Sequence, residues 1–507
     1  MSLVSSFIDG ATLIITPTTL ALIAVGVVAG LILGATPGIG PVPGIALALP
    51  LTLGLQTWEA LSLLFAIYVG GMYGGAVSAI LINVPGTAGA IASTFDGYPF
   101  SLRGEATYAI QISVLTSAFG TIIASFLLII SVPILVSLIA LFGTPEYALV
   151  AIFGLTIIPL ISQYSMGKAL IMAAFGVLLS SVGMPPTSAT PRYTLGVSDL
   201  SNGIEFIAVL LGIFAVAEMI KLTAYKGSLS DSQSGGNSTE ATMESTTVSD
   251  ISDRLVEIFI RNPITFIKSL FIAIVIGFIP AAGGAVSNII AYGVEKATAK
   301  NSESFGTGDV RGLISAESAN SGTIPSTLVP LLAFGIPGSP TAAVILGGML
   351  MHGLNPGPGI FNDSVHLSYA TFLSVAIAGL FLIVIGLFTA TKMVRLARLE
   401  MTTIVPPVII LCVVGTYALS LSFVDVAIVM LFGLLGYLMI KYNYSAVALV
   451  LGILLGPIIE ENVERSFSLG DFGIFFAAPL RIVLVLLIIA SLVLPLMMTI
   501  HKQYGGN

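Results

Sequence analysis

Apolar segments long enough to cross a membrane recur along the whole chain, separated by short polar stretches. Many are about 20 residues long, the length an α-helix needs to span a bilayer core of about 30 Å. They lack the strict apolar and polar alternation of a membrane β-barrel. The pattern predicts an all-α polytopic membrane protein with roughly a dozen helices, several of them broken. Clear examples cover residues 13–33, 59–82, 106–130, 204–222, 367–391 and 482–500.

Composition supports this assignment and removes several other classes of protein. The chain is 56% hydrophobic and only 8% charged, with a mean hydropathy of +1.06, which a soluble protein would not tolerate on its surface. Its single cysteine, Cys412, excludes a disulfide framework. Phosphate-loop, HExxH and GxSxG signatures are absent from the sequence. We therefore expect no catalytic residues, no organic cofactor, no metal site and no nucleic-acid partner.

Proline and glycine interrupt the apolar segments at four places. The first is "GATPGIGPVPGIALALP", residues 34–50. Inside a bilayer each backbone group freed by such a break costs several kcal/mol unless something satisfies it. The other three are "NVPGTAGA" at 83–90, "GFIPAAGG" around Pro280, and "GIPGSPTAA" at 335–343. Because unsatisfied backbone groups in a bilayer are so unfavourable, the presence of four such breaks indicates a functional site.

The breaks divide into two pairs that occur in the same order in each half of the chain. Residues 226–254, rich in Ser, Thr, Gly and acids, form the expected flexible linker between a first transmembrane half, 1–225, and a second, 255–507. Paired broken helices are typical of secondary transporters with internal repeats. Lys and Arg mark opposite loops in the two halves, which predicts inverted repeats.

The same charge pattern predicts the orientation of the chain in the membrane. Cytoplasmic loops carry the excess of Lys and Arg. By this rule the linker and the C-terminus are cytoplasmic, and the N-terminus faces outward. Three arginines, Arg192, Arg465 and Arg481, do not fit the scheme.

The broken helices are the expected binding sites. A helix that begins at mid-depth presents free N–H groups and a positive dipole end, which bind anions. Unwound carbonyls and nearby polar groups can hold Na⁺ or a proton. The expected substrate-binding residues are Pro37, Gly38, Gly40, Asn83, Pro85, Gly86, Thr87, Pro337, Gly338, Ser339 and Thr341. The expected cation-binding residues are Ser287, Asn288, Glu317 and Asn320.

Structural explanations compete with these assignments. Small residues let membrane helices pack closely, so Gly26, Gly30 and Gly34, spaced by four, predict a packing face. The Pro-Gly motifs themselves can serve packing. Glu317 can bind a cation or cap a helix. Asp96 and Arg103, in "DGYPFSLRGEA", predict a structural loop at the cytoplasmic face.

Four motifs carry a resemblance to a known family. They are "GATPGIGPVPGIALALPLTLGL", "IYVGGMYGGAVSAILINVPGT", "DGYPFSLRGEA" and "FGIPGSPTAAVILGGMLMHGLNPGP". The chain resembles, over nearly its whole length except the linker, the large membrane subunit of the tripartite tricarboxylate transporters, the TctA family. The resemblance implies a permease in the cytoplasmic (inner) membrane of a prokaryote. It would work with a small membrane subunit and an extracytoplasmic solute-binding protein to import carboxylates such as citrate, driven by a cation gradient.

Other functions remain open from the sequence. The same architecture could transport another organic anion, such as an aromatic carboxylate or a sugar acid. An intramembrane enzyme would need a charged or metal-binding constellation within its spans, and none is evident. A passive channel would not need two pairs of Pro-Gly breaks.

Overall fold

A computed structural model describes residues 3–36, 40–161, 165–185, 190–224, 248–280, 282–362, 364–396 and 401–504. Within these ranges the chain is almost entirely helical, and it contains no strand beyond one isolated bridge between Gly183 and Arg192. The predicted all-α architecture is confirmed. Most of the expected linker, residues 225–247, lies outside the described residues, and residues 248–254 begin helix α12 (Val248–Val256).

Seven helices of the described residues are long and apolar enough to cross a membrane, or up to eight if a bent pair counts as one span. The bent pair joins α12 and its continuation to α13 (Pro263–Gly277) at an angle of 78°. Five of the six segments expected from hydropathy coincide with spanning helices, and the sixth lies in α22 (Pro479–Tyr504). The spanning helices are α2 (Pro17–Ala35), α4 (Thr57–Ile82), α6 (Ala106–Ile139), α9–α10 (Phe206–Ala224), α18 (Val365–Leu396), α20 (Phe423–Lys441) and α21 (Ala446–Leu469).

Two segments of the chain share one order of elements. The first runs from α2 through a break to α3 (Pro41–Ala48) and α4, then through a second break to α5 (Ile91–Leu102) and α6. The second runs from α13 through a break to α14 (Gly283–Thr298) and α15 (Val310–Phe334), then through a break to α16 (Pro340–Met351), the short α17 (Pro358–Asn362) and α18. Each segment therefore contains two broken helical hairpins.

Equivalent helices of the two segments run in opposite directions. On α4, Tyr68 contacts Thr327 of α15, and Met72, further along α4, contacts Asn320, which lies earlier in α15. The helices α6 and α18 show the same relation, since Gly379 packs against Ile122 and Gly386 packs against Val114. The two segments are thus inverted relative to each other, as the charge pattern predicted.

Glycines hold the first hairpin together. A Cβ on Gly30 or Gly34 of α2 would collide with the carbonyl oxygen of Ile67 or Gly71 on α4, and one on Gly26 would lie 2.8 Å from the carbonyl oxygen of Leu63. Backbones can approach this closely only where no side chain intervenes. The predicted packing face is confirmed.

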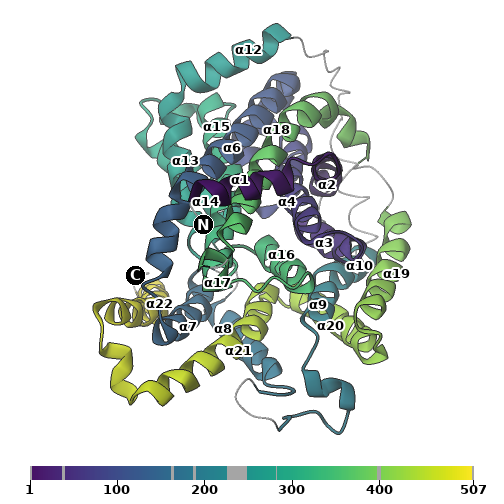
Figure 1. The fold of residues 1–507 in the computed structure, drawn as a ribbon. Coiled ribbons are helices and arrows are strands. Elements are labelled where there is room, and N and C mark those ends of the chain that lie inside the picture. The colour runs from purple at the N-terminus through teal and green to yellow at the C-terminus, as the bar shows by residue number, and fades with distance from the viewer. Residues whose placement is uncertain are drawn as a thin grey trace.

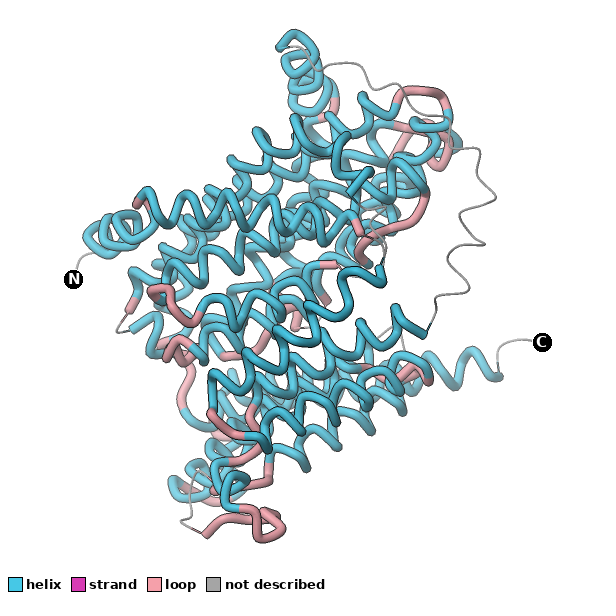
Figure 2. The backbone as a smooth tube through the Cα atoms, turned by 90° about the vertical axis from the view of Figure 1, so that its right-hand side faces the viewer, coloured by secondary structure: helices cyan, strands magenta, loops and turns pink. Residues whose placement is uncertain are grey.

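The remaining helices flank the repeated core (Figure 1). The helices α7 (Thr144–Ile161), α8 (Met166–Ser180), α21 and α22 lie together in the lower part of that view. The helices α7, α21 and α22 share a separate apolar cluster around Ala148 and Leu455, and α8 packs on α7 and α21 through Ala173. The helices α9 and α10 pack on α20, and α10 also packs on α19 (Met401–Ser420). The N-terminal helix α1 (Leu3–Ile14) lies along α18. The N- and C-terminal ends of the chain lie at opposite sides of the bundle (Figure 2).

Candidate substrate site at two helix breaks

The breaks that follow α4 and α15 have the same backbone geometry. Each of these two helices ends at a residue in the left-handed conformation, Asn83 with φ 56° and Gly335 with φ 69°. Three residues later a glycine N–H bonds back to the helix it has just left. Gly86 donates to the carbonyl oxygen of Gly75 at 3.2 Å, and Gly338 donates to that of Thr327 at 3.3 Å. Two separate sequences thus build one structural motif twice.

Close packing explains the glycine in each Pro-Gly pair. A Cβ on Gly86 would collide with the carbonyl oxygen of Gly34 at the end of α2. A Cβ on Gly338 would lie 2.9 Å from the carbonyl oxygen of Gly277 at the end of α13, and 2.8 Å from the Cα of Thr327. Each break therefore lies directly against the first hairpin of its own segment, and a side chain at either glycine would force the two apart.

Each long helix also reaches into the break of the other segment. The hydroxyl of Tyr68 on α4 lies 2.9 Å from the Oγ of Ser339, in the second break. At the equivalent position of α15, Asn320 donates to the carbonyl oxygen of Met72 at 3.4 Å, and its Oδ1 lies beside Gly89, in the first break. Asn288 of α14 donates to the carbonyl oxygen of the same glycine. These contacts join residues from both segments in one buried cluster.

The start of α14 links the two breaks. Gly283, with φ +50°, would place a Cβ 3.0 Å from the Cβ of Ser339. Its neighbour Gly284 would place one 2.8 Å from the Oδ1 of Asn320. A side chain at either position would separate α14 from the cluster, so small residues here let the helix begin between the two breaks.

Several polar groups in this cluster have no partner among the described residues. The Oδ1 atoms of Asn288 and Asn320, both on fully buried residues, and the buried Oγ1 of Thr87 accept or donate no hydrogen bond. The helices α3, α5 and α14 begin without a side-chain cap. Buried polar atoms in folded proteins are normally paired, and uncapped helix N-termini attract anions. The cluster is chemically suited to a ligand that brings both negative charge and hydrogen-bond donors.

The other expected site residues divide between this cluster and other places. Gly40, with φ +65°, lies at the start of α3 beside Gly86 and Thr87. Thr341 is buried in the first turn of α16, and Pro337 is buried in the break before it. Asn83 is exposed at the end of α4, and Pro85 is partly exposed. Pro37 and Gly38 lie outside the described residues.

The expected cation-binding residues have different environments. The hydroxyl of Ser287 is occupied, because it lies 2.7 Å from the Oγ1 of Thr323 and donates to the carbonyl oxygen of Ala319 at 3.2 Å. Glu317 lies in the interior of α15, so the interpretation of this residue as a helix cap is wrong. Its carboxylate accepts hydrogen bonds from Ser93 on α5 and, at 2.6 Å, from Ser117 on α6.

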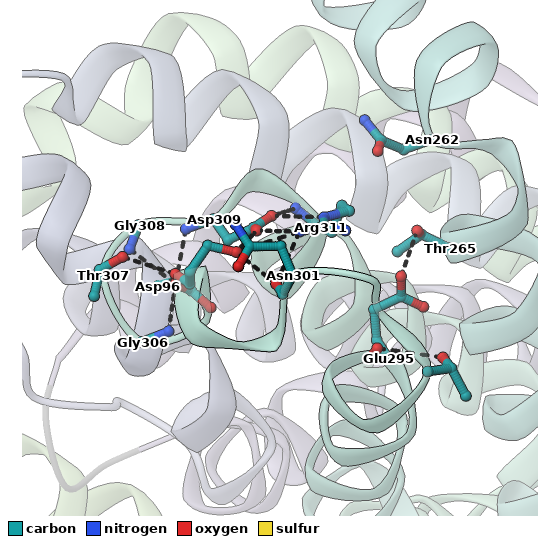
Figure 3. A network of polar contacts seen from close by, with 12 residues as sticks. Asp96, Asn262, Thr265, Glu295, Asn301, Gly306, Thr307, Gly308, Asp309 and Arg311 are labelled. Carbon is teal, nitrogen blue, oxygen red and sulfur yellow. Dashed lines mark hydrogen bonds and ion pairs between the residues drawn. The ribbon is translucent and has the colours of Figure 1, made fainter.

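A second polar network holds the two segments together at one end of the bundle (Figure 3). The Oδ1 of Asp96 accepts backbone hydrogen bonds from Gly306, Gly308 and Asp309 at 2.8 to 2.9 Å, and its Oδ2 accepts one from the Tyr292 hydroxyl at 2.9 Å. Figure 3 shows Asp96 pointing into the loop before α15.

Asp309 takes part in the same network, and its neighbours shift its pKa. Burial raises the pKa of Asp309, but hydrogen bonds from Arg311 and Ser304 outweigh burial and hold that pKa below its usual range.

The predicted loop at 96–105 is wrong in its extent, because residues up to Leu102 belong to α5. Arg103 directly follows the helix and donates to the carbonyl oxygens of Thr307 and Gly308.

Comparison with known proteins identifies the family. The model of the tripartite tricarboxylate transporter TctA family matches residues 20–451, which is most of the chain. This chain belongs to the TctA family. It is therefore a subunit of a tricarboxylate transporter and a multi-pass membrane protein.

Two relatives of this TctA-family chain come from Agrobacterium vitis. An uncharacterized 52.8 kDa protein in the TAR-I ttuC' 3'region is 31% identical over 505 residues, covering 99% of this chain and 98% of the relative. An uncharacterized protein in the TAR-II ttuC' 3'region is 30% identical over 230 residues, covering 45% of this chain and 95% of the relative. No solved structure matches the chain.

Three residues of the TctA-family cluster escaped the sequence analysis. Tyr68 and Gly89 contribute to the contacts between breaks, and Ser93 binds Glu317. A signal for Tyr68 was present. Superposing "NVPG" on "GIPG" places Tyr68 opposite Asn320, and both are polar residues in the middle of a membrane-length helix. Gly89 and Ser93 carried no comparable signal.

Proposed function

We propose that this chain is the permease subunit that moves citrate-like di- or tricarboxylates across the cytoplasmic membrane, driven by a Na⁺ or H⁺ gradient. An extracytoplasmic solute-binding protein would deliver the substrate, and a small membrane subunit would complete the complex. The observation that carries the proposal is the buried cluster between the two breaks, where amide oxygens lack partners among the described residues and three helices begin without a side-chain cap.

The chemistry of a hydroxycarboxylate matches this cluster. Backbone N–H groups in the first turns of α3, α5 and α14 are donors for carboxylate oxygens, and such charge-assisted bonds are the stronger kind. The helix α3 offers fewer of these donors because Pro41 and Pro43 have no N–H, and the N–H of Ile91 in α5 already bonds to the carbonyl oxygen of Ala88. The unpaired Oδ1 atoms of Asn288 and Asn320 accept from a substrate hydroxyl or coordinate a monovalent cation. The charge of the substrate is then balanced by dipoles and a cation, so the site requires no buried arginine.

The transport cycle follows from the repeated architecture. Inverted segments allow one fold to open to either side of the membrane around a fixed central site. Each break contacts the opposite segment at the cluster, so a movement of one segment against the other would change access to the cluster without dismantling either hairpin.

The proposed orientation places residues 54–58 and 352–366 outside, and the linker and residues 295–311 in the cytoplasm. Each of the three exceptional arginines is paired with a glutamate, as Arg192 with Glu460, Arg465 with Glu461, and Arg481 with Glu146, at 2.6 to 2.8 Å.

Labelling with an impermeant thiol reagent tests this orientation. Reagent added to intact cells should modify Gln56→Cys and Asn355→Cys but not Ser302→Cys, all of which replace exposed residues. The natural Cys412 is fully buried and serves as the unlabelled background. Modification of all three introduced cysteines would refute the orientation.

Uptake of labelled citrate by the reconstituted complex tests the function. We expect Asn288→Ala to lower uptake at least tenfold, because loss of a hydrogen bond to a charged ligand costs roughly 1.5–3 kcal/mol. Asn355→Ala, in the exposed loop after α16, is the matched control and should transport normally. Competition by unlabelled sugar acids and aromatic carboxylates separates the alternative substrates. Absence of carboxylate uptake by the folded wild-type complex would refute the proposal.

A further inference from the structure

Glu317 is a buried acid without a cationic partner. Its side chain is 0% exposed, and it takes part in none of the ion pairs formed by the described residues. Both carboxylate oxygens are held by hydroxyl groups, one from Ser93 in the first turn of α5 and one from Ser117 in α6. An ionised carboxylate in such a place is strongly disfavoured unless a positive charge accompanies it.

Two other titratable groups lie near this carboxyl group. Tyr73 of α4 is close enough to Glu317 to interact with its charge, and the buried Tyr73 hydroxyl has no hydrogen-bond partner among the described residues. From α5, Asp96 lies one helical turn beyond Ser93, but its oxygens are occupied by three backbone N–H groups and by Tyr292 of α14. Neither group supplies a positive charge.

The buried acidic side chains on the remaining helices that pack on α15 form ion pairs with residues other than Glu317. Glu295 of α14 pairs with Lys268 of α13 at 2.6 Å, and Glu146 of α7 pairs with Arg481. On α18 the histidine, His366, lies in the first turn, where its backbone carbonyl oxygen packs against Gly10 of α1. The buried part of α6 presents hydroxyl groups, among them Ser117, and α16 contains no titratable residue. Glu317 therefore has no fixed counter-charge in this part of the molecule.

Glu317 is also next to the proposed substrate site. It lies one turn before Asn320 on α15, which places the two on the same face of the helix, about 5–6 Å apart at Cβ. Its partner Ser93 lies in the first turn of α5, the uncapped helix that begins just after Gly89. A negative charge at Glu317 would repel a substrate carboxylate bound here.

We propose that Glu317 is the proton-binding site that couples carboxylate transport to a proton gradient, an inference that rests on the proposed function. A proton from the outer solution forms an O–H bond with the Glu317 carboxylate and leaves a neutral acid. The neutral acid no longer repels the substrate, so proton and substrate bind more tightly together than either binds alone. Release of the substrate on the cytoplasmic side restores the free site, and the O–H bond breaks to release the proton there.

Citrate transport by the full complex in liposomes tests this assignment with Glu317→Gln, which keeps the size and hydrogen-bonding capacity of the side chain. We expect the variant to lose accumulation driven by a pH gradient at least tenfold. Exchange of internal for external citrate, which needs no net proton movement, should stay within about threefold of wild type. In infrared difference spectra, the protonated-carboxyl band that appears on citrate binding to wild type should be absent from the variant.

Glu295→Gln is the matched control, since it removes another buried acid that does have a cationic partner. It should keep the pH-driven accumulation per folded molecule. Glu317→Gln that still concentrates citrate in a pH gradient overturns the assignment. Loss of a sodium-driven accumulation in the variant, with no pH dependence in wild type, overturns it in favour of a metal cation. Wild type that exchanges no citrate at all overturns the proposed function itself, and this inference with it.

Discussion

The helices α5 and α16 occupy equivalent places in the two inverted segments, yet their side chains do different things. Both contain 12 residues and both follow a break with the same backbone hydrogen bond. The helix α16 begins at Ser339, whose side chain accepts from the N–H of Ala342 at 3.1 Å, and most of its residues are buried apolar or glycine. The helix α5 begins without a side-chain cap and carries Ser93 and Asp96.

This difference separates a packing role from a chemical role. In α16 the polar groups at the break are satisfied within the protein, by the cap and by Tyr68. In the region of α5 the Oγ1 of Thr87 and the Oδ1 of Asn320 have no partner within the part of the chain that the structure describes, and Asp96 bonds α5 to the other segment. The two breaks thus share one backbone geometry but differ in their polar groups. Those at the break before α16 are hydrogen-bonded within the protein, whereas some of those at the break before α5 are available to a ligand.

The largest effect is expected at Asp96, whose equivalent on α16 is Gly348. Asp96→Asn removes the charge from an acceptor of three backbone hydrogen bonds and should lower the free energy of unfolding by about 3 kcal/mol. Gly348→Ala should cost less, because its Cβ would meet the flexible ends of Leu64 and Leu49. Thermal melting of both proteins in detergent compares them. A Gly348→Ala protein that melts lower than Asp96→Asn would contradict this ranking.

The next effect compares Asn320 with its equivalent, Tyr68. Asn320→Leu removes an unpaired Oδ1 and should reduce citrate uptake at least tenfold. Tyr68→Phe removes a hydroxyl whose partner is Ser339 and should reduce uptake no more than about threefold, since the lost bond is internal and neutral. Uptake per folded molecule is the measurement. Equal losses would mean that both breaks contribute equally to binding.

A smaller pair of effects should separate affinity from stability. Thr87→Val removes a hydroxyl that has no partner among the described residues, so citrate should bind several-fold more weakly while the melting temperature stays constant or rises. Ser339→Ala removes the cap of α16 and should lower stability by about 1 kcal/mol with little change in affinity. Calorimetric titration and melting of both variants give the four values. If Ser339→Ala weakened citrate binding and Thr87→Val lowered only stability, the second break, rather than the first, would bind the substrate.

The smallest effect concerns His352, at the C-terminal end of α16, whose Nε2 lies 3.0 Å from the Oγ1 of Thr52. Burial lowers the pKa of His352 below its usual value. The unfolded chain therefore binds a proton more readily, and this residue's contribution to stability is lost as pH falls from about 6.5 through the lowered pKa. Melting of wild type between pH 7.5 and 5.5 should fall slightly more than that of His352→Gln. Identical pH dependence in the two proteins would contradict the assignment.

Local features of the chain could be predicted without the structure. The spanning segments, the four Pro-Gly breaks, the packing glycines of α2 and the inverted order all follow from hydropathy, charge and backbone chemistry within short stretches. The extent of α5 could not be predicted, because Gly97 and Pro99 favour a loop, whereas the helix continues to Leu102 in the structure. Bonds from the loop 306–309 to Asp96 supply the tertiary stabilisation that overrides this local preference.

Sequence alone determined that this protein is a membrane bundle with two broken hairpins in each half, because helix length and helix interruption depend on neighbouring residues. Only the tertiary structure decided which polar residues meet there. Tyr68 reaches Ser339, Asn320 reaches Gly89, and Ser93 and Ser117 enclose Glu317 because α4 and α15 cross in opposite directions. The physical reason is that burial leaves each polar group dependent on partners hundreds of residues away, and no local pattern specifies those partners.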